Sequence, residues 1–320
     1  MLRLILIFLI VLGCSRNEDN LNEKISNKDF SEENFSYYEG LSNFNIVHDG
    51  YRREYFIYIP PNIESRENLP VIFNFHGYSG QAQQFFNMTD LRGIANENGV
   101  VLVYPQGAPL DGGASHWNAA PLNSLTPSFV NKSNMKDLDF FLALLDEVNQ
   151  NNILDLNRVY AIGYSNGGMF SHFLACNTNN ILAAIGDVAG TMLEATYNNC
   201  NPSSPIPVLK IHGTSDPVVA YDGFEQEGFK TVDEVIDFWR SNNNLNGEVI
   251  FDDLGNSQSF NSQVGFEKYT YESNENNSSI VHYKMVRGGH WWDYSLDDNL
   301  KTSRLLWDFL KIILKVIKLN

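Results

Sequence analysis

Basic residues, cysteines and long apolar runs are all scarce in this chain. Its 320 residues include 22 Lys and Arg against 38 Asp and Glu, a formal net charge of -16. No basic run could follow a phosphate backbone, so we expect no nucleic-acid partner. No pair of Cys or His residues has the spacing of zinc ligands, and we expect neither a metal nor a cofactor. The acidity indicates only a solvated surface.

The N-terminus is apolar over a short stretch. Residues 4–12 follow Met1-Leu2-Arg3 and match the apolar part of a signal peptide, which is too short to cross a membrane as a helix. Residues 11–14, Val-Leu-Gly-Cys, resemble a bacterial lipobox. The resemblance implies that Cys14 becomes the lipid-modified first residue of the mature protein. Cleavage of an ordinary signal peptide is the alternative.

The residues after Cys14 are rich in Asn, Glu, Ser and Lys, as in a solvated tether. We therefore expect a signal peptide at 1–13, a lipid-anchored tether at 14–40 and one globular domain at 41–320. This organisation predicts a protein outside the cytoplasm that is held on a membrane. The pair Glu18-Asp19 resembles a signal that directs some lipoproteins to the cell surface. The expected location is therefore a membrane outside the cytoplasm, with the outer membrane and the cell surface as the alternatives.

A glycine-rich hexapeptide at residues 163–168, Gly-Tyr-Ser-Asn-Gly-Gly, lies between a strand-like run at 158–162 and a helix-like run at 169–176. This context is typical of a nucleophile elbow, in which glycines allow a serine to sit on a tight strand-to-helix turn. The helix N-terminus would stabilise negative charge that develops beside the serine. Ser165 is therefore the candidate nucleophile, and an incidental serine in a glycine-rich loop is the alternative.

An acid and a histidine follow in the order that such an elbow requires. Asp216 comes just after a buried strand-like run at 208–211, and His290 follows another at 280–286 on a glycine-rich loop. His290 would take the proton of Ser165, while Asp216 would fix the imidazole tautomer. Asp187 and Asp222 are rival acids, but Asp216 is favoured because the acid should lie at the carboxyl end of a strand.

Two backbone N–H groups are needed to stabilise a developing oxyanion. One should come from Asn166, directly after the nucleophile. The other should come from the loop after the strand at 69–75, where Tyr78 is preferred over Ser79 as the second donor.

The chain resembles the esterase/polyhydroxybutyrate depolymerase family of α/β-hydrolases, which is grouped with feruloyl and acetyl xylan esterases in carbohydrate esterase family 1. The resemblance covers residues 50–310 and rests on the segments 53–60, 75–77, 103–107, 117–119, 163–168, 212–217 and 288–290. It implies a serine ester hydrolase acting on hydroxycinnamoyl, acetyl or short hydroxyalkanoate esters, either small molecules or linked to polysaccharide. Relatives often carry cysteines after the Trp-Asn segment, whereas this chain has a long polar loop over 120–134 that borders the expected acyl pocket.

Strand and helix patterns alternate along the chain. Strands are expected at 100–104 and 185–189, and helices at 136–151 and 232–240. Such alternation predicts an α/β fold with a mostly parallel sheet covered by helices on both faces. Three later strand patterns, at 248–252, 265–272 and 280–286, predict an antiparallel extension. The apolar and lysine-containing run at 305–319 predicts a final helix packed on the sheet, with an interfacial membrane helix as the alternative.

Removing Cys14 leaves Cys176 and Cys200, an even pair in an oxidising compartment. Compartment and family resemblance together favour a disulfide between them, and two separate thiols are the alternative. Among the aromatic residues, Trp117, Trp291 and Trp292 are the candidates to flank the active site, the last two because they adjoin His290.

Two other functions are compatible with parts of this pattern. A prolyl-oligopeptidase-like peptidase would share the sheet and the triad, but peptide substrates usually need a specificity domain or a charged clamp that we do not find. A non-catalytic surface lipoprotein could bind glycan through an aromatic cleft, but a binder has no need of all three triad residues. We expect a monomeric, lipid-anchored ester hydrolase whose physiological ester the sequence does not identify.

Overall fold

The computed structural model describes residues 39–61, 63, 67–110, 112–122, 133–150, 152–257, 263–273, 278–297 and 300–315. Cys14, the predicted signal peptide and all but the last two residues of the predicted tether lie outside these ranges. The first strand begins at Gly40, so the sheet starts one residue before the expected domain boundary. Among the described residues, no helix combines the length and apolar character needed to cross a membrane.

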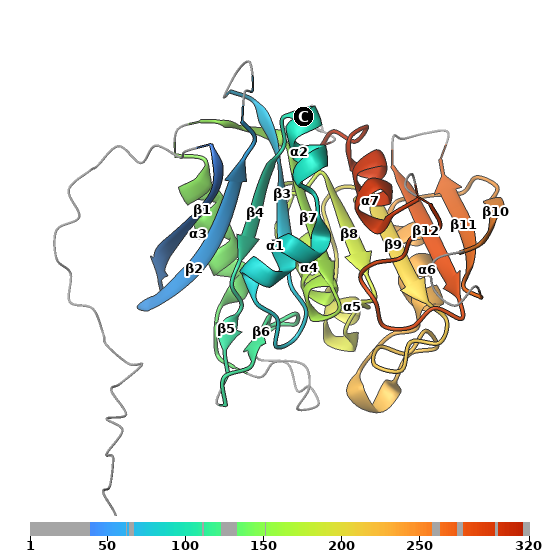
Figure 1. Cartoon of the computed structure of the whole chain (residues 1–320). Helices are drawn as coiled ribbons and strands as arrows, with labels where there is room; N and C mark the ends of the chain where they lie inside the picture. Colours follow the sequence, from blue (N-terminus) through green and yellow to red (C-terminus); the bar gives the residue numbers. More distant parts are fainter. Residues whose placement is uncertain are drawn as a thin grey trace, which may run out of the picture. The chain divides into compact units, whose positions relative to one another are not determined.

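A ten-stranded sheet forms the centre of the described part of the chain, in the order β1-β2-β4-β3-β7-β8-β9-β12-β11-β10 (Figure 1). Its strands are β1 (Gly40–His48), β2 (Tyr51–Ile59), β3 (Leu69–Phe75), β4 (Val101–Pro105), β7 (Leu154–Tyr164), β8 (Ala184–Val188), β9 (Val208–Gly213), β10 (Ile250–Asn256), β11 (Gly265–Glu272) and β12 (Ser279–Val286). The six central strands, from β4 to β12 in this order, are parallel. The strands at both edges are antiparallel.

Helices cover both faces of the sheet. They are α1 (Ala82–Thr89), α2 (Arg92–Asn98), α3 (Asp137–Val148), α4 (Asn166–Asn177), α5 (Glu194–Asn199), α6 (Val232–Asn242) and α7 (Thr302–Leu310). A short pair, β5 (Ala108–Pro109) and β6 (Ser115–His116), and a 3₁₀ turn, η1 (Glu225–Glu227), complete the fold. The predicted α/β-hydrolase fold is confirmed. Of the three strands predicted to form an antiparallel extension, β10 and β11 do so, whereas β12 joins the parallel part of the sheet because it pairs with β9 in the parallel direction.

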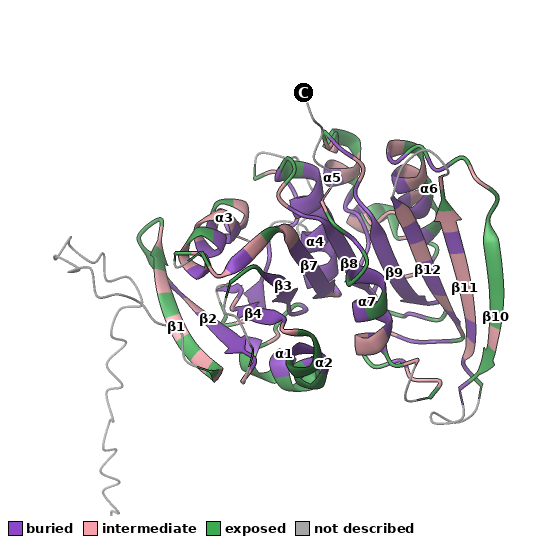
Figure 2. Ribbon diagram, turned by 90° about the horizontal axis from the view of Figure 1, so that it is seen from above, coloured by how far each residue is buried: buried purple, intermediate pink, exposed green. Residues whose placement is uncertain are grey.

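The alternation of side chains along each strand divides the core into two layers. On β3, Phe73 faces a layer that also contains Phe141 of α3, Phe170 of α4 and Trp239 of α6. The preceding residue of the strand, Ile72, faces the layer that contains α1, α2 and α7. Because both faces are covered, the central strands are mostly apolar and mostly buried, and β3 is buried along its whole length. Asp187 of β8 and Lys210 of β9 are polar exceptions within this buried region. The edge strands β1 and β10 are more exposed (Figure 2).

The final helix, α7, ends earlier than the apolar run at 305–319 predicts. It ends at Leu310, and residues 311–315 leave the helix because their backbone bonds elsewhere: Tyr160 Oη donates to Ile313 O at 2.7 Å, and Lys315 N donates to Asn157 O at 2.9 Å. The helix itself packs on β8 and β9, as expected. Residues 316–319 of the predicted helix lie outside the described ranges.

The predicted disulfide is present. Cys176, near the end of α4, is bonded to Cys200, which follows α5, and their Cα atoms are 4.8 Å apart. This spacing lies in the normal range for a disulfide. The bond ties α4, the helix that follows Ser165, to the segment that leads into β9.

Candidate active site

Ser165 lies on a strained turn between β7 and α4. Its backbone has φ 55° and ψ -119°, a conformation that L-residues rarely adopt outside functional turns. Gly163 and Gly167 make the turn possible, because a Cβ atom on either would lie about 2 Å from backbone atoms, 2.1 Å for Gly163 and 2.0 Å for Gly167. Ser165 N also donates to Val188 O of β8 at 2.9 Å. The glycine-rich hexapeptide therefore forms the strand-to-helix elbow that the sequence predicts.

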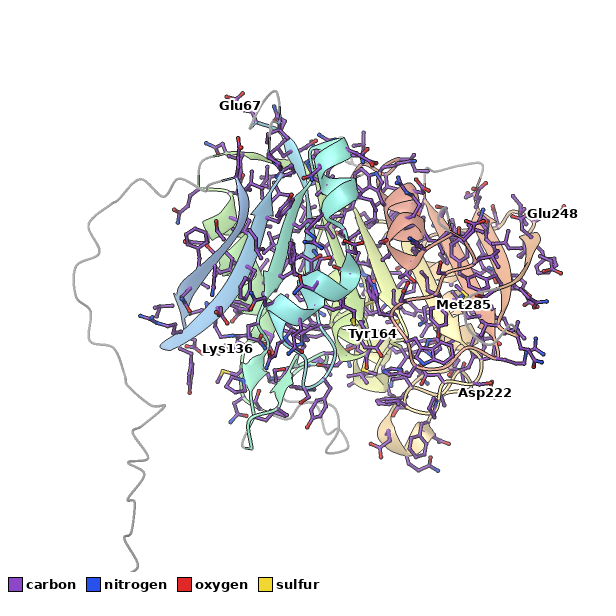
Figure 3. The ribbon with its side chains drawn as sticks, in the orientation of Figure 1. Glu67, Lys136, Tyr164, Asp222, Glu248 and Met285 are labelled. Atoms are coloured by element: carbon purple, nitrogen blue, oxygen red, sulfur yellow. A yellow bond between two sulfur atoms is a disulfide. The ribbon has the colours of Figure 1, made fainter. Side chains whose placement is uncertain are left out.

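His290 joins Ser165 to Asp216. Its Nε2 lies 3.0 Å from Ser165 Oγ, and its Nδ1 lies 2.7 Å from Asp216 Oδ2. Because an ionised carboxylate only accepts hydrogen bonds, Nδ1 carries the proton and Nε2 is left to accept one from Ser165. The three residues come from the ends of β7, β9 and β12, which lie at one edge of the parallel sheet; Figure 3 labels Tyr164 and Met285 at two of these ends.

Asp216 is held ionised by its surroundings. Burial disfavours its charge, but hydrogen bonds from His212 and His290 outweigh burial and hold the pKa of the Asp216 carboxyl well below its usual range. Its Oδ1 also accepts from Val218 N and Val219 N, at 2.8 Å each. The two rival acids are placed elsewhere: Asp187 pairs with Lys210 and His172, and Asp222 is exposed in the loop beyond β9.

Tyr164 supports the loop that carries the histidine. Its hydroxyl donates to His290 O at 2.9 Å, and the two ring centroids are 5.1 Å apart. Tyr294 makes a second bond to this loop, from its hydroxyl to Gly289 O. Sequence reasoning assigned neither tyrosine a role. For Tyr164 a signal existed, since it immediately precedes the nucleophile at the end of a strand, but its partner lies 126 positions along the chain.

The turn after β3 lies against the nucleophile. A Cβ atom built on Gly77 would be 3.3 Å from Ser165 Cβ. Ser79 N donates to Ser115 O at 2.8 Å, so this N–H is already engaged by the polypeptide. Of the two donors considered for the oxyanion, Ser79 is therefore the less suitable.

His76 orients the peptide group that precedes Tyr78. Gly107 N donates to His76 Nε2 at 2.9 Å, so Nδ1 carries the proton and donates to Gly77 O at 2.8 Å. Gly80 N donates to the same oxygen at 3.0 Å. Because the peptide bond is trans, the Tyr78 N–H points away from this oxygen. Burial lowers the pKa of His76 to about 4, which keeps the ring neutral in this role.

Asn166, the other candidate donor, is the first residue of α4, where a backbone N–H has no partner within the helix. Its side chain is fixed separately, because Asn166 Oδ1 accepts from Trp117 N at 2.8 Å and Asn166 Nδ2 donates to Trp117 O at 3.0 Å. The side-chain amide is thus engaged by the Trp117 backbone, and any role at the oxyanion belongs to the main chain.

Residues 53–226 match the family model described as esterase PHB depolymerase, which covers more than half of the chain. The chain belongs to this family. The matched segment contains Ser165 and Asp216 but ends before His290. His290 is placed beside these two residues by the folded structure and not by the family match.

Two curated relatives are moderately similar to this chain in sequence. The chain is 33% identical over 179 residues to NocK of Nocardia uniformis subsp. tsuyamanensis, an esterase by name, and 26% identical over 173 residues to feruloyl esterase B of Piromyces equi. These alignments cover 56% and 53% of this chain but only 49% and 30% of the two relatives, so the chain spans about half or less of their lengths.

A solved structure shares the fold at low sequence identity. The S-formylglutathione hydrolase of Agrobacterium tumefaciens aligns over 87% of this chain and 97% of its own, with a TM-score of 0.55 and 12% identity. At this identity the likeness concerns the α/β-hydrolase fold alone.

Two of the three tryptophans expected beside the site are core residues, and those predictions are wrong. Trp117 has no exposed surface; it stacks on Phe170, and its indole N–H donates to His76 O at 3.0 Å. Trp292 is 4% exposed and packs edge-on against Phe85 of α1. Both rings are taken up by packing between the sheet and its helices, so neither presents a face to a substrate. Trp291 is 41% exposed and is the one of the three with an open surface.

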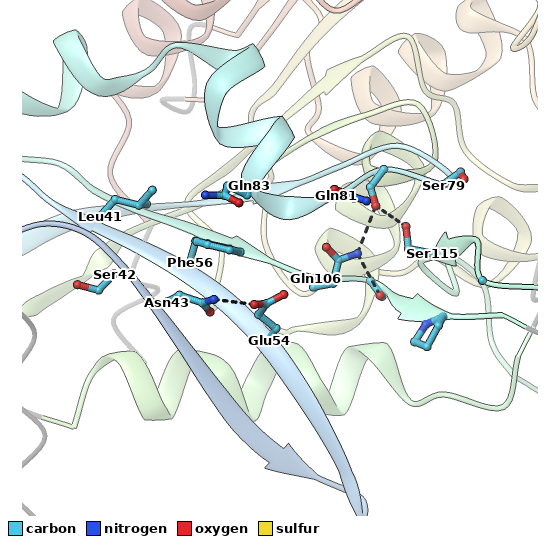
Figure 4. Close-up of a pocket in the computed structure, with 14 residues that line it drawn as sticks. Leu41, Ser42, Asn43, Glu54, Phe56, Ser79, Gln81, Gln83, Gln106 and Ser115 are labelled. Atoms are coloured by element: carbon cyan, nitrogen blue, oxygen red, sulfur yellow. Dashed lines mark hydrogen bonds between the residues drawn. The ribbon is translucent and has the colours of Figure 1, made fainter. Parts of the chain in front are cut away.

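A polar cleft of about 740 Å³ is lined in part by the residues that follow Tyr78 in the loop after β3 (Figure 4). Ser79, Gly80 and Gln81 form one end, and β1 and β2 contribute Asn43 and Glu54, which are bonded to each other at 2.6 Å. Gln106 closes the floor and donates to Gly80 O at 3.2 Å. The loop after β3 therefore lies against Ser165 at Gly77 and lines the cleft at Ser79, Gly80 and Gln81. The side chains of Ser165, His290 and Asp216 are not among the residues that line the cleft.

Proposed function

We propose that this protein is a carboxylic ester hydrolase that works through an acyl-enzyme on Ser165. The observation that carries the proposal is the continuous set of contacts from Ser165 Oγ through His290 to Asp216, at 3.0 and 2.7 Å, on a nucleophile turn with positive φ. Membership of the esterase PHB depolymerase family supports the same reaction class.

Each step uses a group already placed. As Ser165 Oγ attacks the carbonyl carbon of the ester, His290 Nε2 accepts the serine proton. The carbonyl oxygen becomes negatively charged and accepts hydrogen bonds from the N–H groups of Asn166 and Tyr78. When the bond from carbon to the alcohol oxygen breaks, His290 returns the proton to the departing alcohol. Asp216 stays ionised throughout and stabilises the imidazolium.

Water then completes the cycle. His290 takes a proton from a water molecule, whose oxygen attacks the acyl-serine carbonyl. The bond from that carbon to Ser165 Oγ breaks, the serine recovers its proton from His290, and the carboxylic acid leaves. No cofactor is needed for either half of the reaction.

We propose hydroxycinnamoyl, acetyl or short hydroxyalkanoate esters as the substrate class, free or attached to polysaccharide. Relatives named as feruloyl esterases and as an acetylxylan esterase/xylanase support the first two acyl groups. The loop over 120–134, expected to border the acyl pocket, is described only at 120–122 and 133–134. The choice among these esters therefore needs a substrate panel.

We further propose that the enzyme acts outside the cytoplasm on a lipid anchor at Cys14. The lipobox-like residues 11–14 motivate the anchor, and the disulfide between Cys176 and Cys200 supports an oxidising compartment. Replacing Cys14 by Ser should move the protein from the membrane fraction to the soluble fraction without changing kcat/KM on small esters. A Cys14→Ser protein that stays with the membrane rejects the anchor.

The test of the reaction is hydrolysis of p-nitrophenyl acyl chains, methyl ferulate, acetylated xylan and hydroxybutyrate oligomers by the wild-type and Ser165→Ala enzymes. Ser171→Ala, a buried serine further along α4 that donates to Gly167 O, is the matched control. Loss of turnover on every active ester is expected for Ser165→Ala alone. Substantial activity remaining in purified Ser165→Ala rejects the acyl-enzyme.

A further inference from the structure

Lys210 of β9 is completely buried, although its side chain carries a charge at neutral pH. Its Nζ lies 2.8 Å from Gly190 O, 2.9 Å from Asp187 Oδ2 and 2.7 Å from His212 Nδ1. An ammonium group has three hydrogens to donate, and here each has an acceptor. The site is thus built to hold a charged lysine.

The contact with Lys210 determines which nitrogen of His212 carries a proton. An ammonium group only donates, so His212 Nδ1 must accept, and the proton of the neutral ring is on Nε2. A second contact requires the same tautomer, because Nε2 lies 2.8 Å from Val219 O, and a carbonyl oxygen only accepts. Burial, followed by the charge of Lys210, lowers the pKa of His212 and so favours the neutral ring.

His212 holds the turn that carries the acid of the triad. Its Nε2 bonds Val219 O and also lies 3.4 Å from Asp216 Oδ2. Val218 N and Val219 N in turn donate to Asp216 Oδ1. The position of the His212 ring therefore sets the position of the turn, and the turn sets the orientation of the carboxylate that bonds His290.

The other contacts of Lys210 reach the turn that supports the nucleophile. Asp187 Oδ1 accepts from Gly190 N at 2.8 Å, which closes the turn after β8. This turn lies against the elbow, since a Cβ atom on Gly190 would be 2.8 Å from Ser165 O. Lys210 thus bonds both the β8 turn behind Ser165 and the imidazole that holds Asp216.

We propose that Lys210 and His212 are positioning residues of the triad: Lys210 fixes the tautomer of His212, and His212 fixes the Asp216 turn relative to the Ser165 elbow. This inference rests on the proposed function, because it assigns these residues to the same reaction. Neither residue touches the reacting atoms, so neither is catalytic in itself.

The remaining titratable groups around Lys210 are consistent with this role. From α4, His172 Nε2 bonds Asp187 Oδ2 at 2.9 Å, with its Nδ1 accepting from the indole of Trp239 at 3.1 Å. From β12, His282 contacts the backbone oxygen of Lys210 at 3.2 Å and Tyr221 Oη at 2.9 Å. Lys210 and Asp187 form one balanced ion pair. A buried pair of this kind contributes little to stability compared with apolar packing, which favours orientation as its function.

The first experiment compares two replacements of His212. Phe fills the ring's space without polar atoms, whereas the Gln side chain offers an oxygen to Lys210 and an N–H to Val219 O. His212→Phe should lose kcat by roughly 10- to 100-fold with KM within about threefold, and His212→Gln should recover to within about threefold of wild type. His282→Phe, at an equally buried histidine that does not contact Asp216 or the Lys210 ammonium, is the matched control and should keep kcat within about threefold. The rate at which a fluorophosphonate labels Ser165 should follow kcat across the set.

The second experiment observes the tautomer directly. Long-range ¹⁵N–¹H spectra of the enzyme with ¹⁵N-labelled histidine should show His212 neutral with its proton on Nε2, the His212→Gln spectrum identifying its signals. Replacing Lys210 alone would leave the Asp187 charge buried without its partner and could unfold the protein, so the two are changed together as Lys210→Met with Asp187→Asn. In a folded double variant, kcat should fall by about tenfold or more and His212 should no longer be restricted to the Nε2 tautomer.

Several results would overturn the inference: a proton on His212 Nδ1 in the wild type, a His212→Phe enzyme with normal kcat, or equal losses in His212→Phe, His212→Gln and His282→Phe. Ser165→Ala measured in parallel separates the two hypotheses. Activity retained in Ser165→Ala rejects the proposed function, whereas its loss together with a fully active His212→Phe rejects only the positioning role. The spectra test the tautomer whatever the activity.

Discussion

Tyr164 donates its hydroxyl hydrogen to the carbonyl oxygen of His290 at 2.9 Å. The residue directly before Ser165 thereby holds the loop that carries His290, so the elbow and the proposed general base are joined by a bond outside the proposed triad. Burial raises the pKa of Tyr164 to about 12, so the hydroxyl keeps its proton and remains a donor throughout the range in which esters are assayed.

Tyr164→Phe should therefore lower kcat by about fivefold, because one hydrogen bond of about 1 kcal/mol no longer fixes the His290 loop. KM on small esters and the urea midpoint should change little, since the ring remains. Steady-state kinetics with p-nitrophenyl acetate provides the measurement. A large rise in KM at unchanged kcat would instead place the hydroxyl in substrate binding.

His290→Ala and the double variant Ser165→Ala/His290→Ala should each lose about 10³-fold or more in kcat, and the double variant should be little worse than either single one. The reason is that the serine is activated only through the histidine, so removing both removes one function. Additive losses would show that the two residues act independently. Circular dichroism of each variant checks that the domain remains folded.

That Ser165, Asp216 and His290, the proposed nucleophile, acid and base, lie together could be predicted because each is tied to a local constraint. Ser165 needs glycines at fixed offsets, and Asp216 and His290 each follow an apolar strand pattern that ends at the same edge of a parallel sheet. The apolar runs also identified the central strands, since burial on both faces leaves little choice of residue.

The direction of side chains in loops could not be predicted in the same way. Trp291 and Trp292 are neighbours, yet one is exposed and the other is packed against Phe85. Adjacency to His290 does not determine this, because the turn that follows the histidine decides which ring faces the core. Lys210 shows the same limit: it occupies a buried strand position, and its partners Asp187 and Gly190 become neighbours only when β8 and β9 pair.

The disulfide should stabilise the fold by about 3 kcal/mol, because it closes a segment with a sequence separation of 24 in the unfolded chain. The double variant Cys176→Ala/Cys200→Ala should have a lower urea midpoint with the same m-value, while kcat changes little. Peptide mapping without reductant checks the bond in the wild type. Two alkylatable thiols in protein isolated from an oxidising compartment would reject it.

Trp291 and Trp292 offer a matched pair for substrate recognition. Trp291→Ala removes an exposed ring beside His290 and should lower kcat/KM on methyl ferulate by about fivefold relative to p-nitrophenyl acetate, about 1 kcal/mol of aromatic contact. Trp292→Ala should instead destabilise the domain by about 3–5 kcal/mol and lower turnover of all esters alike, because its ring is core. An equal effect of Trp291→Ala on both esters would remove that ring from the acyl site.

Acid should destabilise this protein well before its carboxylates titrate, because three buried histidines stay neutral in the fold. Burial lowers the pKa of His76 to about 4 and that of His282 to about 3, and it lowers the pKa of His212 as well. In the unfolded chain each would take up a proton near its ordinary pKa of about 6.5. Below that pH the unfolded state binds more protons, so the free energy of unfolding falls as the pH falls toward the folded pKa values.

A histidine that is protonated in the unfolded chain and neutral in the fold contributes a slope of at most about 1.4 kcal/mol per pH unit. His76 and His282, with folded pKa values of about 4 and about 3, together give up to about 3 kcal/mol per unit between about pH 6 and 5, and His212 adds to the slope in the same direction. Urea unfolding at pH 7, 6 and 5 measures this slope. His282→Gln removes one titrating group and should reduce the slope by about 1.4 kcal/mol per unit, whatever its effect on stability at pH 7. A free energy of unfolding that is constant from pH 7 to 5 would show that these rings are protonated in the fold, in conflict with the neutral tautomer that the contacts of His76 require. An unchanged slope in His282→Gln would show the same for His282.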